Sequence, residues 1–203
     1  MGPGATYAIV TFVAGLLLLL GWLYATARNP RSGAMLGKSF LLFAVPIMFL
    51  PAHLFQFPLG MWVLVACEEG LKAFGSTREQ NRVDRFWFVC LFGIWELTVD
   101  KPFWGFAVAQ SGESWDRFAI AGFAYATALP VLMHAVTAAI YAFTFERRLW
   151  AALLTSWVVH TAFNEAVDYF GVSPMAAIIE TIVLGLILIS IISREQRLAR
   201  STS

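Results

Sequence analysis

The sequence predicts an all-α protein, a polytopic bundle of about seven transmembrane helices, and both its composition and its apolar runs indicate this. Of the 203 residues, 59% are hydrophobic and 13% are charged, and the mean hydropathy is +0.70. These polar side chains are too few to cover a water-exposed surface. Because one span takes about 20 apolar residues, the chain has room for about seven spans. We therefore expect residues 1–203 to form a single transmembrane domain.

Polar or charged breaks divide the chain into seven apolar runs. The runs are Tyr7–Thr26, Ser39–Phe57, Gly60–Gly75, Phe86–Val99, Arg117–Phe145, Leu149–Tyr169 and Pro174–Ser193. The third and fourth runs are short and contain acidic residues. This combination is typical of membrane helices that line a cavity rather than lipid.

Lysine and arginine residues collect in alternate breaks between the runs and after the last one. These breaks hold Arg28, Arg31, Lys38, Arg78, Arg82, Arg85, Arg147, Arg148, Arg194, Arg197 and Arg200. The intervening breaks hold only Lys101 and Arg117. Because these residues concentrate on the cytoplasmic side of membrane proteins, the pattern predicts an outside N-terminus and a cytoplasmic C-terminus. The expected location is the plasma membrane, the inner membrane of a bacterium.

Titratable side chains interrupt the apolar runs at similar depths. A charged side chain at the bilayer centre costs about 2.5 to 3.5 kcal/mol, so each one needs a reason. We counted the residues from each titratable side chain to a charged residue at the expected cytoplasmic end of its run. The pairs are Glu68 and Arg78, Arg85 and Glu96, His134 and Glu146, and Arg148 and His160. At 1.5 Å per residue, these spacings of about 10 to 12 residues correspond to roughly 15 to 18 Å. We therefore expect four helices to bring their titratable groups to one level.

The residue types at this level suit peptide hydrolysis. Residues four apart share a helix face, so Glu68 aligns with Lys72 and His160 with Asn164. Carboxylates and imidazoles together can deprotonate a water, bind a developing oxyanion and protonate an amine. Glutamate and histidine are also zinc ligands. The residues therefore leave two mechanisms open, a glutamate-activated water without a cofactor and a zinc-dependent reaction.

Four motifs at these positions resemble those of the PrsW family of intramembrane proteases. The wider group includes the CAAX prenyl endopeptidases, bacteriocin-processing relatives and the Aph scaffold subunit of gamma-secretase. The motifs are Glu68–Lys72 (Glu-Glu-x-x-Lys), Phe92–Glu96 (Phe-x-x-x-Glu), the lone His134, and His160–Asn164 (His-x-x-x-Asn).

The resemblance implies a role for each matching residue. Glu68 or Glu69 would activate the attacking water. Glu96 and His134 would complete the site. His160 and Asn164 would hold the oxyanion. The prenyl endopeptidases usually have histidine at the position of Glu96, so a prenylated substrate is not expected.

We therefore expect an intramembrane endopeptidase that hydrolyses a peptide bond of a membrane-associated protein or peptide, with its candidate catalytic core in residues 60–170. The expected partners are this substrate and the lipid bilayer, and the sequence does not indicate an oligomeric state. A net charge of +1 without a dense basic cluster excludes a nucleic-acid partner.

Other functions fit the same residues. A non-catalytic scaffold resembling the Aph subunit would use buried polar residues for assembly. A proton or ion transporter would equally place carboxylates and histidines inside the membrane. A third alternative is a haem held by His134 and His160.

Overall fold

The computed structural model describes residues 3–49, 60–79, 81–102, 127–144, 148–170 and 174–201, and every element within these ranges is helical. The elements are α1 (Pro3–Ala25), α2 (Ser32–Phe49), α3 (Gly60–Ser76), α4 (Arg82–Trp95), η2 (Glu96–Asp100), α7 (Leu129–Ala139), η4 (Ile140–Thr144), α8 (Leu149–Phe170) and α9 (Pro174–Ser201). The π-helical segments η2 and η4 continue α4 and α7 without a break. The prediction of an all-α protein is confirmed for these residues.

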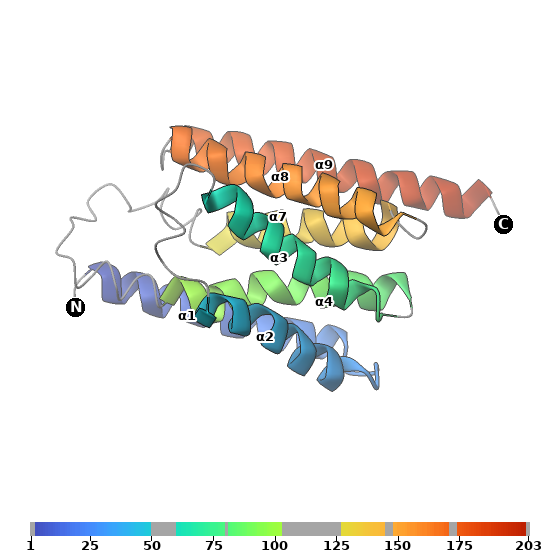
Figure 1. Cartoon of the computed structure of the whole chain (residues 1–203), viewed down its shortest axis with the longest axis horizontal. Helices are drawn as coiled ribbons and strands as arrows, with labels where there is room; N and C mark the ends of the chain where they lie inside the picture. The colour runs from blue at the N-terminus through green and yellow to red at the C-terminus, as the bar shows by residue number, and fades with distance from the viewer. Residues whose placement is uncertain are drawn as a thin grey trace.

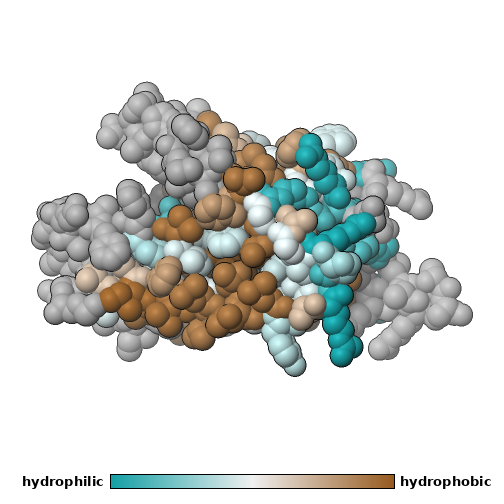
Figure 2. All heavy atoms as spheres, turned by 90° about the horizontal axis from the view of Figure 1, so that it is seen from below, coloured by the Kyte–Doolittle hydropathy of each residue, from teal (hydrophilic) through white to brown (hydrophobic). Residues whose placement is uncertain are grey.

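Consecutive helices run in opposite directions along the long axis of the bundle (Figure 1). α1, α3, α7 and α9 run toward the end at which the C-terminus lies, and α2, α4 and α8 run back. The connections from α1 to α2 and from α3 to α4 therefore lie at the same end as the C-terminus. Figure 2 shows hydrophilic residues gathered at this end and hydrophobic residues along the adjoining surface.

α4 is the central helix, and it packs against α7, α2, α1 and α3. Its start is capped by Asn81, whose side-chain oxygen accepts a hydrogen bond from the Asp84 backbone N–H at 2.8 Å. Phe88 and Phe92 are fully buried on α4, and Met133 and Val136 are buried on α7. This apolar packing fixes the two helices that carry Glu96 and His134.

Several helix boundaries differ from the apolar runs. α2 begins at Ser32 rather than Ser39, because Lys38 is accommodated inside the helix. The Lys38 ammonium pairs with Glu79, donates to the Gly75 carbonyl and lies 4.5 Å from the centre of the Phe88 ring. α9 continues past Ser193 to Ser201. The first part of the run 117–145 and the second half of the run 39–57 lie outside the described residues.

Two helices in the described ranges are long and apolar enough to cross a membrane, Ala5–Ala25 and Met175–Arg194. Shorter apolar helices cover Ser32–Phe43 and Leu129–Phe143. By length and composition, these two helices support membrane association. The seven spans expected from the sequence are not established by this measure.

Candidate active site inside the helix bundle

α3 brings two adjacent carboxylates and a lysine into the interior of the bundle. The Lys72 Nζ atom lies 2.6 Å from Glu69 Oε1 and 2.8 Å from Glu68 Oε1. Spacings of three and four residues place the three side chains on one face of the helix. The Glu69 and Lys72 side chains are fully buried, whereas Glu68 keeps 25% of its side chain exposed. One ammonium group therefore faces two carboxylates of different accessibility.

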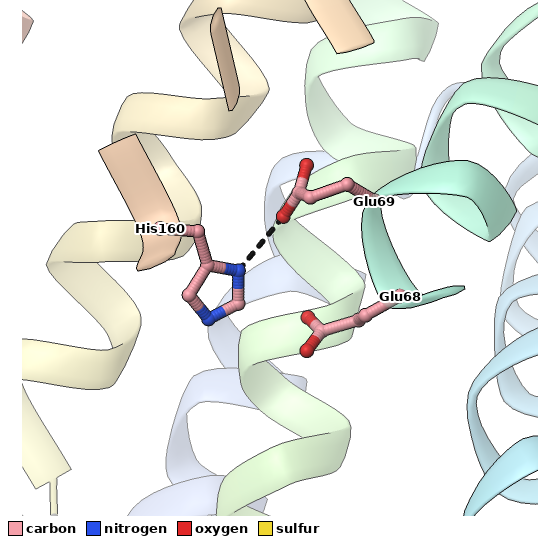
Figure 3. A group of neighbouring side chains, drawn as sticks. All are labelled: Glu68, Glu69 and His160. Carbon is pink, nitrogen blue, oxygen red and sulfur yellow. Dashed lines mark hydrogen bonds and ion pairs between the residues drawn. The ribbon is translucent and has the colours of Figure 1, made fainter. Parts of the chain in front are cut away.

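His160 of the neighbouring helix α8 faces these carboxylates (Figure 3). Its Nδ1 atom lies 2.8 Å from Glu69 Oε1. A carboxylate paired with an ammonium is ionised and only accepts hydrogen bonds, so we assign the shared proton to Nδ1 of His160. In the tautomer with its proton on Nδ1, the Nε2 atom is an acceptor.

A second lysine, glutamate and histidine lie on the α4 and α7 side of the site. Glu96 Oε2 lies 2.8 Å from His134 Nε2, and Glu96 Oε1 lies 2.8 Å from Lys101 Nζ. The π-helical turn of η2 begins at Glu96, and the Lys101 backbone N–H closes it on the Glu96 carbonyl. Such π-helical insertions occur frequently at functional sites.

Glu68 lies near both histidines. Its Oε1 atom is 3.7 Å from His134 Nε2, and the ring centres of His134 and His160 are 5.7 Å apart. Glu69 and Glu96 each hold a histidine by a short hydrogen bond, whereas Glu68 is beyond that distance from His134. The Glu68 carboxylate is therefore free of a histidine hydrogen bond within the described part of the chain.

A metal ion has one candidate ligand set among the described residues. Ligand atoms of Glu68, Glu69 and His160 all lie within 4.8 Å of one another. The Lys72 ammonium, however, contacts oxygens of both carboxylates. A divalent cation on these oxygens would meet a positive charge within a few ångströms, and such repulsion is strong in a low-dielectric interior. The ion pairs favour a site that works without a metal.

The structure brings together five of the six residues expected from the sequence. These five are Glu68, Glu69, Glu96, His134 and His160. The sixth, Asn164, points its amide at Met61 Sδ, 3.5 Å away. It makes no hydrogen bond to the other five in the described ranges. Its side chain lies one helical turn beyond His160 on α8.

Two further residues of the site were missed in the sequence. Lys101 follows Glu96 by five residues, which in an α-helix would place it roughly 140° away around the axis. The π-helical turn closes that angle, and nothing in the sequence indicated such a turn. Tyr141, in η4, donates from its hydroxyl to the Glu69 carbonyl at 3.0 Å. No polar spacing signalled Tyr141, because a buried tyrosine in an apolar run is ordinary packing.

Fold and site together define a helical-bundle protein with an ionic centre inside an apolar interior. Comparison of the chain with protein-family models, with curated proteins and with solved structures finds no match.

Proposed function

We propose that this protein is an intramembrane endopeptidase, similar to the PrsW proteases, in which Glu68 activates a water to hydrolyse a membrane-associated protein or peptide. The observation that carries the proposal is the position of Glu68. It is a partly exposed carboxylate beside two imidazoles, each of which is already held by another glutamate. A carboxylate in such a place can take a proton from water.

The proposed reaction uses one water, and Glu68 carries a proton from this water to the leaving amine. Ligand atoms of Glu68, Glu69 and His160 lie within 4.8 Å of one another, so a water bound to Glu68 would also lie close to His160. In the proposed reaction this water donates one hydrogen bond to Glu68 and the other to Nε2 of His160, the ring nitrogen that does not contact Glu69. The water oxygen attacks the carbonyl carbon as Glu68 takes the proton. The C–N bond then breaks, and the amine leaves with that proton.

The oxyanion role implied for His160 changes in this arrangement. Because His160 donates from Nδ1 to Glu69, its Nε2 accepts rather than donates. We therefore assign His160 to orienting the water. Asn164 is one turn away with its amide on Met61, so we leave it out of the proposed reaction.

The apolar surface of the bundle supports the proposal that the site lies within a lipid bilayer. Most outward-facing side chains of α1 and α9 are apolar, and Leu17, Leu20, Leu186 and Ile189 are 61–64% exposed. The interior instead contains the fully buried Glu69 and Lys72. Apolar side chains outside and ion pairs inside suit a hydrocarbon solvent, in which charged groups must pair with one another.

The proposed topology has seven spans, with the N-terminus outside and the C-terminus in the cytoplasm. The alternating helix directions support it, because the arginine-rich connections fall at the end that also carries the C-terminus (Figures 1 and 2). The proposed location is the plasma membrane, the inner membrane of a bacterium.

Cleavage of a transmembrane test substrate by purified protein, compared with Glu68→Gln, tests the proposal. Glutamine keeps the shape of the side chain and removes the base, so we expect cleavage to be lost while thermal unfolding stays close to wild type. Cleavage at the wild-type rate by a folded Glu68→Gln variant would remove Glu68 as the base. Proton or ion flux in proteoliposomes that Glu68→Gln abolishes, without any cleavage, would instead indicate a transporter.

A further inference from the structure

The reaction proposed above assigns no role to Lys101, although this lysine is in direct contact with the site. Its Nζ atom lies 2.8 Å from Glu96 Oε1, and its side chain is 26% exposed. The other oxygen of the same carboxylate, Oε2, lies 2.8 Å from His134 Nε2. One carboxylate therefore connects a lysine to a histidine.

We propose that Lys101 is a positioning residue, whose ion pair with Glu96 holds His134 in the tautomer that carries its proton on Nε2. An ammonium at 2.8 Å keeps the Glu96 carboxylate ionised, and an ionised carboxylate only accepts hydrogen bonds. The proton between Glu96 and His134 therefore belongs to Nε2. Which ring nitrogen of a histidine is protonated is commonly set by such a partner.

The consequence of this tautomer is a bare Nδ1 atom inside the site. His134 Nδ1 is buried and has no hydrogen-bond partner in the part of the chain that the structure describes. A nitrogen without a proton can only accept a hydrogen bond, so Nδ1 presents an acceptor to the groups around it. In the opposite tautomer Nδ1 would donate instead, and the polarity of this part of the site would be reversed.

The other half of the site repeats the same order of residues. Lys72 lies 2.6 Å from Glu69, and Glu69 lies 2.8 Å from His160. In both halves an ammonium keeps a glutamate charged, and the glutamate orients a histidine. The motif containing Lys72 is visible in the sequence, whereas Lys101 reaches Glu96 only through the π-helical turn of η2. Lys101 is thus the counterpart of Lys72.

Histidine tautomers can be observed directly in this protein, because the chain contains only three histidines. NMR of protein labelled with ¹⁵N-histidine distinguishes the two neutral tautomers, and a His134→Asn variant identifies the His134 signals. We expect wild-type His134 to carry its proton on Nε2. We expect Lys101→Met to give averaged signals of the two tautomers, and Lys101→Arg to restore the wild-type pattern.

Turnover provides a second readout, which rests on the proposed peptidase function. Lys101→Met should lower kcat about 10- to 100-fold, by analogy with the loss of the partner that orients a metal-bound histidine. The KM should change little, because Lys101 acts through Glu96 rather than on the substrate.

Lys38→Met is the matched control. Lys38 is also 26% exposed and also pairs with a glutamate, but this partner, Glu79, lies in the connection between α3 and α4. This variant should leave both the His134 signals and kcat unchanged. Lys101→Gln, which keeps a donor to Glu96 without the charge, serves as the second neutral variant if Lys101→Met does not fold.

Two outcomes would overturn the positioning role. One is a folded neutral variant of Lys101 in which His134 stays in the single Nε2–H tautomer and kcat equals that of the wild type. The other is a wild-type His134 with its proton on Nδ1. If the tautomer of His134 depends on Lys101 but the protein cleaves no substrate, the peptidase function is rejected and the positioning role of Lys101 stands.

Discussion

Gly93 of α4 lies directly against His134 of α7. A Cβ atom added at Gly93 would lie 2.9 Å from His134 Cβ and 3.0 Å from His134 Cδ2. These distances are shorter than ordinary van der Waals contact, so the two helices approach this closely only because residue 93 has no side chain. The place of the His134 ring next to Glu96 depends on this contact.

Gly93→Ala should therefore destabilise the protein by about 1 to 3 kcal/mol, the usual cost of overpacking a core. It should also lower cleavage by displacing His134. Gly185→Ala is the control, because a Cβ atom there meets nothing within 4 Å. Thermal unfolding of the two variants measures the difference, and equal stability would contradict the close contact.

Lys72→Met should be more destabilising than a surface substitution, at about 3 to 5 kcal/mol, because it leaves buried carboxylates without their counter-ion. Adding Glu69→Gln to Lys72→Met should recover part of this loss by removing one unpaired charge. Chemical denaturation in detergent gives the free energies of unfolding. A double variant that is less stable than Lys72→Met alone would be the opposite result.

His160→Ala should abolish cleavage in a folded protein, since it removes the nitrogen proposed to orient the water. Asn164→Ala should keep most of the cleavage rate, because the Asn164 amide contacts Met61 rather than the ionic cluster. Rates on the same transmembrane substrate compare the two variants. Equal losses would return Asn164 to the reaction as an oxyanion ligand.

Cleavage should persist in the presence of metal chelators, because the Lys72 ammonium contacts one oxygen of each carboxylate of the candidate ligand set and would repel a divalent cation there. Elemental analysis of active, purified protein should find zinc well below one equivalent. Activity that chelation removes and zinc restores would reverse this expectation and favour the ligand set of Glu68, Glu69 and His160.

The C-terminus should be cytoplasmic and the N-terminus external. Reporter fusions that are active on only one side of the membrane test each end of the chain separately. An active external reporter at the C-terminus would contradict the seven-span topology, and it would imply a missed or added half-span near residues 102–116.

The sequence by itself determined the all-helical class of the described residues and the spacing of the titratable residues along each helix. That spacing could be predicted because each residue of a helix advances the chain by 1.5 Å, whatever surrounds it. The same regularity placed Glu68 and Lys72 on one face of α3, as the structure has them. The residues that interrupt apolar runs could therefore be grouped before their contacts were known.

Only the tertiary structure decided which of these residues contact one another. The rotation of a helix about its axis depends on packing against its neighbours, such as the approach of α4 to α7 at Gly93. Because of that packing, His160 hydrogen-bonds Glu69 rather than Glu68, and the Asn164 side chain points toward Met61. Lys101 depends in addition on the π-helical turn of η2, a local change in helix geometry that its own residues did not predict.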